Sequence, residues 1–301
     1  MIQAEGIGSR VPSAFIGGVH SVYRQACNIE ADDGMLVTLV SAGLGNLPRG
    51  VLCKAAAPMD FRTLWCVSET VERCGTELRA VRTGFAVDLS SAAVWHCELG
   101  ACAIDPGADR TIDIVSSLCT ISSKLGAAGG FAPLVLGNEE PASSFDSAMR
   151  RRRERALPVL AGAIGRFDAD RAVEGLAPLV GLGPGLTPAG DDFIVGLLAA
   201  LWSRYDGRAF VAKLHGPLAR LAATSHPISR QFLMDALEGE VCEPLSDLAV
   251  AVSMHDHERA AAGALRVMRF GHTSGADALT GFLFGLQPAL VRDRAIIPSP
   301  S

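Results

Sequence analysis

The hydrophobic pattern of this 301-residue chain changes its period about half way along, and this change limits the possible folds more than any other feature. Before residue 140, short apolar runs alternate with turns rich in Gly, Asp and Ser, as strands and their connections do. After residue 140, apolar residues recur at three- and four-residue spacings, which is typical of amphipathic helices. We therefore predict an α+β fold, with a β-rich N-terminal domain over residues 1–140 and a helical domain over residues 141–301.

Individual elements follow from the same patterns. Strands are expected at residues 35–40, 85–89, 92–95 and 111–115, and the last of these alternates with period two. Residues 64–74 and 114–125 fit a strand and a helix equally well. Helices are expected at residues 148–167, 170–180, 188–205, 209–223, 228–237, 245–252, 257–268 and 275–286. A polar linker over residues 136–146 and a frayed tail over residues 292–301 complete the expected organisation.

The composition excludes several classes of protein. Hydrophobic residues make up 49% of the chain and charged residues 20%, so it can bury a large core and is not globally disordered. A net charge of −5 argues against nucleic acid or an anionic membrane as the main partner. The eight cysteines form no C-x-x-C pair, and no signal peptide or membrane-length apolar run is present. We expect a cytoplasmic protein.

The most distinctive stretch is residues 181–193, which have the sequence GLGPGLTPAGDDF. Its density of glycine and proline is incompatible with a helix or a regular strand. The glycines, Gly183, Gly185 and Gly190 among them, allow backbone N–H groups to face a ligand. The stretch lacks the lysine of a Walker A loop, and a helix rather than a strand precedes it. It is therefore a candidate anion-binding loop, and the alternative is a tight connection between two capped helices.

A helix is expected to begin within this stretch. Thr187 followed by Pro188 matches an N-cap with proline at the first helical position. Asp191 and Asp192 then lie in the first turn, where the helix dipole favours negative charge. Two carboxylates would repel a bound anion, and a divalent cation such as Mg²⁺ bridging carboxylate and phosphate would remove this conflict. The sequence does not identify a cofactor, and it predicts no metal ligands.

A second candidate segment, residues 271–279, has the sequence GHTSGADAL and precedes the last predicted helix. Thr273 or Ser274 is suited to cap this helix, next to Gly275. His272 lies at the positive end of the helix, which favours its neutral form and leaves a nitrogen able to accept a proton. The alternative is an ordinary capped helix with a hydrogen-bonded histidine.

The two segments resemble each other. Residues 190–198 and 275–283 align without gaps on the pattern G-x-D-x-x-x-G-x-L. The second glycine of each pattern would allow two helices to approach closely. We therefore predict that the two helix N-termini converge and bring Asp192 and Asp277 to one site, unless the similarity arises by chance.

Other segments carry weaker signals. Residues 224–229 end one predicted helix and begin another, and they either lend a hydroxyl or imidazole to the site or serve as a cap. The arginine run at residues 150–155 is either a solvated helix face or a site for an acidic partner. No G-x-S-x-G motif supports nucleophilic catalysis.

The glycine-rich stretch and the Gly-His-Thr-Ser-Gly-x-Asp segment resemble the AllH-like family, which was long a domain of unknown function. That family includes a subunit of oxamate carbamoyltransferase from anaerobic allantoin degradation. The residues that carry the resemblance are 181–193, 271–277, 18–23 with Asn28, and 87–92 with Trp95.

The resemblance implies a subunit of a carbamoyl-transferring enzyme, a small anionic substrate such as carbamoyl phosphate or a carboxylate, and hetero-oligomeric partner chains. From residue chemistry, the catalytic candidates are Asp192, His272 and Asp277, with His272 moving the proton of the attacking nitrogen. The anion-binding candidates are Gly183, Gly185, Thr187, Gly190, Asp191, Thr273, Ser274 and Gly275. The alternative is a non-catalytic subunit that binds a small carboxylate or acts as a scaffold. Polar residues where the two loops meet would favour the enzyme, and an apolar exposed face would favour the scaffold.

Overall fold

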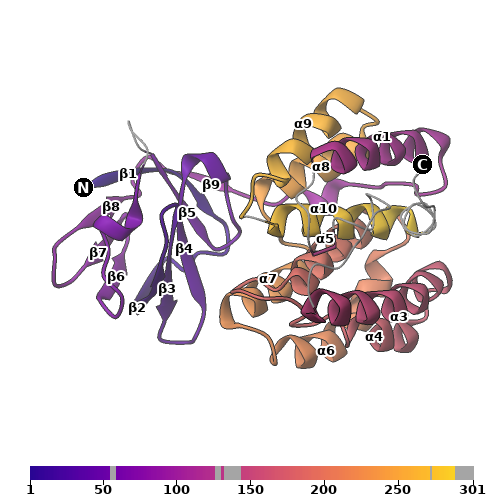
Figure 1. Ribbon diagram of the computed structural model, residues 1–301. Coiled ribbons are helices and arrows are strands. Elements are labelled where there is room, and N and C mark those ends of the chain that lie inside the picture. Colours follow the sequence, from indigo (N-terminus) through magenta and orange to yellow (C-terminus); the bar gives the residue numbers. More distant parts are fainter. Residues whose placement is uncertain (55–58, 126–129, 132–143, 272, 289–301) are drawn as a thin grey trace. The chain divides into compact units, whose positions relative to one another are not determined.

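Figure 1 shows the computed structural model of the chain, which describes residues 1–54, 59–125, 130–131, 144–271 and 273–288. These residues form two compact units, Met1–Cys97 and Glu98–Ser301. The domain boundary expected at residue 140 and most of the expected linker lie outside the described residues, as does the expected frayed tail.

The first unit is a barrel of eight strands to which a ninth strand is added. The strands are β1 (Ile2–Gly8), β2 (Ala14–Val22), β3 (Ala26–Ala31), β4 (Leu36–Ser41), β5 (Gly50–Lys54), β6 (Thr70–Cys74), β7 (Glu77–Ala80), β8 (Ala86–Asp88) and β9 (Ala93–Trp95). Their hydrogen-bonded order is β5-β4-β3-β2-β6-β7-β8-β1-β9, and β1 also pairs antiparallel with β5. This last pairing closes the barrel and removes the free edges between β1 and β5.

Alternation along the strands fills the barrel. In β3, Cys27 and Ile29 are fully buried in the core, and in β4 so are Val37 and Leu39, at period two. The strands predicted at residues 35–40, 85–89 and 92–95 are confirmed as β4, β8 and β9. The N-terminal part is thus β-rich, as the sequence predicts.

The second unit is helical. Its helices are α1 (Asp109–Leu125), α3 (Ser144–Arg166), α4 (Ala169–Leu176), α5 (Ala189–Ser203), α6 (Arg208–Ala222), α7 (Pro227–Leu237), α8 (Glu243–Ser253), α9 (His257–Val267) and α10 (Ser274–Leu286). Each of the helices predicted after residue 140 is confirmed, with ends that differ by a few residues. Helix α1 also belongs to this unit, where it packs against α8, α9 and α10.

The strand predicted at residues 111–115 is wrong, because this segment lies within α1. Its five residues alternate in hydrophobicity, but burial along the segment follows a helix: Thr111, Ile114, Val115 and Leu118 are buried, and Ile112 is 38% exposed. Over only five residues, the spacing of apolar residues in a helix and their alternation in a strand can give the same pattern.

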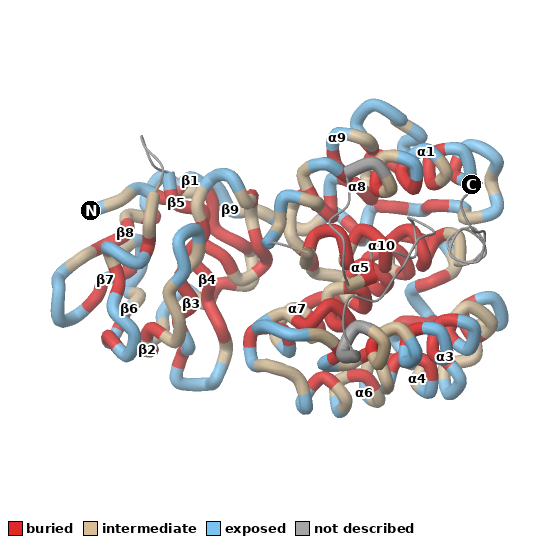
Figure 2. The backbone as a smooth tube through the Cα atoms, in the orientation of Figure 1, coloured by how far each residue is buried: buried red, intermediate tan, exposed pale blue. Residues whose placement is uncertain are grey.

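Helices α5 and α10 form the centre of the helical unit, and Figure 2 shows both buried along nearly their whole length. Glycines allow the close approach. A Cβ atom at Gly196 would overlap the carbonyl oxygen of Ala278, and one at Gly281 would overlap the carbonyl oxygen of Phe193. The two contacts are equivalent, because Phe193 and Gly196 of α5 align with Ala278 and Gly281 of α10. An approximate two-fold axis therefore relates the two helices.

The helices that precede this central pair repeat as well. Asp168 caps α4 by accepting a hydrogen bond from the backbone N–H of Arg171, and Asp256 caps α9 by accepting one from Arg259 in the same way. The residue before each cap has a positive φ, 53° and 55° respectively. The α3–α4 and α8–α9 hairpins therefore share their turn geometry.

Packing within the two hairpins is also equivalent. Gly175 of α4 lies against Leu160 of α3, and Gly263 of α9 lies against Leu248 of α8. Equivalent residues are 88 positions apart in the hairpins and 85 apart in α5 and α10. The helical unit thus contains two similar segments, α3–α5 and α8–α10. The stretch from Gly175 to Gly190 in the first is three residues longer than the equivalent stretch from Gly263 to Gly275 in the second.

Candidate functional site

The predicted convergence of the two helix N-termini is confirmed. The side-chain oxygens of Thr187, just before α5, and Ser274, at the start of α10, share a hydrogen bond of 2.9 Å. The charge of Asp277 also acts on the carboxyl group of Asp192, raising its pKa. Residues from both repeats therefore meet at one place, where α5 and α10 begin.

The glycine-rich loop has the irregular backbone that its sequence predicts. Gly181, Gly183 and Gly185 have φ angles of 69°, 126° and 95°, a region that favours glycine. The backbone N–H groups of Gly183 and Gly185 donate to no other residue in the described part of the chain. These two donors are available to a ligand.

One helix cap differs from the prediction, and the other agrees with it in position. Pro188, rather than Thr187, is the N-cap of α5, and Thr273 is the N-cap of α10 without a capping hydrogen bond from its side chain. The hydroxyl groups of Thr187 and Ser274 instead bond to each other across the site. Tertiary contact has replaced the local contact that the sequence suggests.

Asp191 is fully buried and is hydrogen-bonded to the glycine-rich loop. Its Oδ1 accepts a hydrogen bond of 2.7 Å from the N–H of Gly181, and its Oδ2 accepts hydrogen bonds from the hydroxyls of Ser225 and Ser229. Three donors therefore hold this side chain: Gly181 in the loop, Ser225 just before α7 and Ser229 within α7. Residues 224–229 thus do both things that the sequence suggests: Ser225 and Ser229 supply hydroxyl groups to Asp191, and His226 is the N-cap of α7.

Asp192 is the carboxyl group at the junction. Burial raises its pKa well above the usual 3.8, and the charges of Asp277 and Asp191 raise it further, against opposing hydrogen bonds from Ser274 and Thr187. Its Oδ2 is enclosed and has no hydrogen-bond partner among the described residues. Asp192 therefore keeps a proton at pH values where an exposed aspartate has lost it.

Asp277 occupies the equivalent position on α10 and is fully buried. Its Oδ1 accepts a hydrogen bond from the backbone N–H of Phe131. A Cβ atom at Gly130, whose φ is 58°, would overlap the same carboxyl group. Gly130 and Phe131 are not among the predicted site residues, and the only sequence signal for this segment is the pair of glycines at positions 129 and 130.

Gly190, Gly275 and His272 are three further predicted site residues. Gly190 and Gly275 start the two helices against backbone carbonyls of Leu179 and Val267, where a side chain would overlap. Both are therefore packing positions. His272 lies outside the described residues, so its role stays a prediction.

The described residues contain no group of three or more His, Cys, Asp or Glu side chains placed to hold a metal ion. Among the same residues, no helix is long and apolar enough to cross a membrane.

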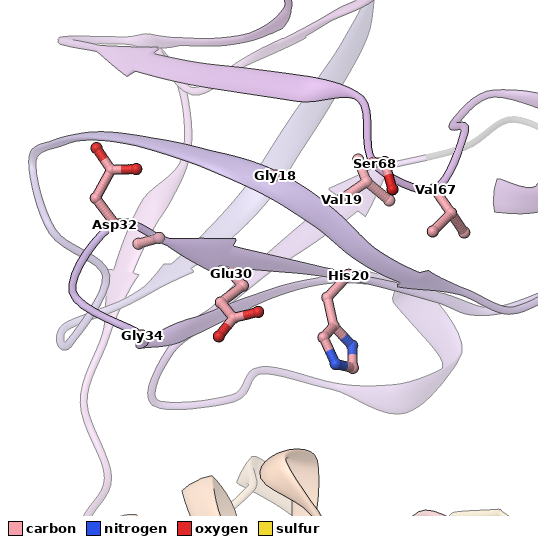
Figure 3. Close-up of a pocket in the computed structure, with 9 residues that line it drawn as sticks. Gly18, Val19, His20, Glu30, Asp32, Gly34, Val67 and Ser68 are labelled. Atoms are coloured by element: carbon pink, nitrogen blue, oxygen red, sulfur yellow. The ribbon is translucent and has the colours of Figure 1, made fainter.

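The barrel carries a separate hollow, which contains none of the predicted site residues (Figure 3). Its volume is about 550 Å³. Its lining residues are Gly18, Val19, His20, Glu30, Ala31, Asp32, Gly34, Val67 and Ser68. Glu30 and His20 project from neighbouring strands to the same side, and Asp32 projects away from them (Figure 3). The hollow is open and holds no constellation comparable to the α5–α10 junction.

Comparison with known families covers both units. A family model described as oxamate carbamoyltransferase subunit AllH matches residues 179–286, which run from the glycine-rich loop to the end of α10. A second model, described as the AllH family N-terminal domain, matches residues 5–94, which form the barrel. No solved structure matches the chain significantly. The chain belongs to the AllH family.

Proposed function

We propose that this chain is a subunit of a carbamoyl-transferring enzyme and that its anionic substrate binds where the N-termini of α5 and α10 converge. The observation that carries the proposal is Asp192, a carboxyl group with a raised pKa and an enclosed, unpartnered oxygen among the described residues at this junction. Perturbed carboxyl groups at such junctions are typical of acid–base catalysts. The polar character of the junction favours the enzyme over the scaffold.

The junction suits an anion. The N–H groups of Gly183 and Gly185 and the positive ends of two helix dipoles supply favourable potential without a charged side chain. Asp191 bonds to internal donors, and a protonated Asp192 adds no charge. The repulsion that Mg²⁺ would relieve is therefore already reduced.

The family description names oxamate, and the reaction that fits is the reversible conversion of oxalurate and phosphate into oxamate and carbamoyl phosphate. A phosphate oxygen attacks the carbamoyl carbon of oxalurate, and the bond from that carbon to the amide nitrogen breaks. The electron pair and one proton go to the nitrogen, which leaves as the amide of oxamate. Asp192 in its protonated form supplies that proton, and as a carboxylate it takes the proton back in the reverse direction.

The family description also names a subunit, so the proposal includes partner chains that complete the enzyme. We place the reaction in the nitrogen catabolism of allantoin, in the cytoplasm. In this scheme the backbone donors of the loop stabilise the charge that develops on phosphate, as preorganised dipoles do.

The test is the phosphate-dependent breakdown of oxalurate by the complex reconstituted with its co-purifying partner chains. Asp192→Asn keeps the size of the side chain but removes the exchangeable proton, and we expect turnover to fall on the order of 10²-fold or more. Asp170→Asn is the matched control, because Asp170 is an exposed aspartate in the first turn of α4. Wild-type turnover in Asp192→Asn would remove the catalytic assignment and leave the scaffold subunit as the alternative.

A further inference from the structure

We infer that Arg153 is a positioning residue, which holds Asp277 through the peptide group between Gly130 and Phe131. The inference deepens the proposed function, on which it rests for its activity readout. Arg153 belongs to the arginine run of α3, for which the sequence suggests a solvated face or a site for an acidic partner.

Arg153 differs from its neighbours in the run. Arg151, Arg152 and Arg155 are exposed, whereas Arg153 is only 2% exposed. A guanidinium group stays charged in proteins, so a buried one requires acceptors and a compensating charge. Burial of this single member of the run therefore points to a specific task.

The guanidinium group of Arg153 makes a hydrogen bond and a cation–π contact. Its Nη1 donates a hydrogen bond to the carbonyl oxygen of Gly130, and its Cζ lies 5.5 Å from the centre of the Phe131 ring. Phe131 is fully buried and stacks on Phe193 of α5, with ring centroids 4.5 Å apart. Arg153 thus fixes both the backbone and the side chain of this segment.

The same peptide group faces Asp277 with its other end. Its carbonyl oxygen accepts from Arg153, and its N–H, which belongs to Phe131, donates to Asp277 Oδ1. Hydrogen bonds at both ends of one peptide group strengthen each other, and those with charged partners are the stronger kind. The buried cation and the buried carboxyl group are therefore joined through a single polarised peptide group.

The backbone is shaped for this contact. Gly130 has a φ of 58°, and a Cβ atom there would overlap Asp277. At Asp192, burial raises the pKa, and the hydroxyls of Ser274 and Thr187, which bond to each other, oppose this rise. Arg153 therefore favours negative charge on Asp277, and the proton of the pair resides on Asp192.

The charged groups that face the pair come from different helices. Arg153 reaches it from α3, and Asp191 acts on it from α5. Asp191 is held by three donors of its own. Removal of the Arg153 charge should therefore act mainly on the distribution of the proton between Asp192 and Asp277.

The closing experiment measures ¹³C-aspartate NMR spectra of the purified chain at neutral pH, with Asp192→Asn and Asp277→Asn used to assign the two carboxyl signals. Arg153→Met keeps the apolar stem over Phe131 but removes the charge and the donor. We expect the Asp277 signal to move toward the protonated position in Arg153→Met. It should stay at the wild-type position in Arg152→Met, an exposed neighbour, and return most of the way in Arg153→Lys. If Arg153→Met does not fold, Arg153→Gln supplies the same test with a donor but no charge. An unmoved Asp277 signal in a folded variant overturns the inference.

The activity readout separates this inference from the proposed function. In the reconstituted enzyme, Arg153→Met should lower kcat roughly 10- to 100-fold, the range for loss of an outer partner of a site residue, with less change in KM. A moved Asp277 signal together with full turnover in Asp192→Asn would contradict the catalytic proposal but keep the role of Arg153. An unmoved signal together with a loss of turnover in Asp192→Asn would do the reverse.

Discussion

The N-termini of α5 and α10 carry the same pattern of glycine and aspartate, but their surroundings differ. At α5, burial raises the pKa of Asp192, and the hydroxyl groups of Ser274 and Thr187 oppose this rise. At α10 the equivalent Asp277 receives a backbone N–H from Phe131, and Ala276 replaces the buried Asp191 of the first repeat. A repeated scaffold can thus bring two equivalent groups to one site, while neighbours outside the repeat make them chemically unequal.

The largest effect on turnover is expected from variants that test whether Asp192 and Asp277 act as one unit. We expect Asp192→Asn and Asp277→Asn each to lower turnover of the reconstituted enzyme on the order of 10²-fold. The double variant should be little worse than either single variant, because groups that act together are strongly non-additive. Additive losses in a double-mutant cycle would show that the two helix starts work independently.

The next effect tests the symmetry of the helix pair. Gly196→Ala and Gly281→Ala each force a Cβ atom into a backbone carbonyl of the opposite helix, and we expect each to lower the free energy of unfolding by about 1–3 kcal/mol. Gly165→Ala in α3 is the matched control, because nothing lies within 4 Å of its Cβ position, and it should stabilise by roughly 0.5–1 kcal/mol. Urea titrations followed by circular dichroism measure all three. A large difference between the two central variants would break the symmetry.

A smaller effect tests whether the anion belongs to the longer loop of the first repeat. Phosphate at about ten times its Kd should stabilise the chain by about 1.4 kcal/mol and raise its Tm, with and without Mg²⁺. Gly185→Ala, at a φ of 95°, should abolish this increase. Gly75→Ala introduces similar strain in the barrel, at a φ of 59°, and should retain it. An increase that persists in Gly185→Ala would place the anion elsewhere.

The smallest effect concerns pH. The pKa of Asp192 is higher in the folded chain than in the unfolded chain, so the folded chain binds more protons and folding loses stability as pH rises. This loss begins near the usual value of 3.8 and is complete above the folded pKa. Thermal unfolding between pH 4 and 8 should therefore show a weaker decline in Asp192→Asn than in the wild type or in Asp170→Asn. Equal declines in all three would contradict the raised pKa.

Local patterns in the sequence predict much of this molecule. The helices after residue 140 and the convergence of Asp192 with Asp277 follow from apolar spacing and a nine-residue repeat. The closure of the barrel through β1 and β5 does not, because this pairing joins strands some fifty residues apart. The partner of Asp277 escaped prediction for the same reason. Phe131 lies 146 residues before it in the chain, and no local pattern encodes such a contact.

The caps show a second limit of local reasoning. Thr187 before Pro188 is a favourable N-cap by sequence, yet its hydroxyl bonds to Ser274, which is 87 residues away. Likewise, an arginine run suggests a solvated face, and only the fold distinguishes Arg153 from the exposed members. Residue type predicts what a side chain is able to do, and packing determines which of those contacts forms.

The glycine contacts between α5 and α10 have a consequence for motion. Sliding of one helix past the other by a turn would bring side chains over the carbonyl groups that Gly196 and Gly281 now face, so the pair cannot ratchet as helices at mobile interfaces do. The spacing of Asp192 and Asp277 is thereby fixed before any ligand arrives.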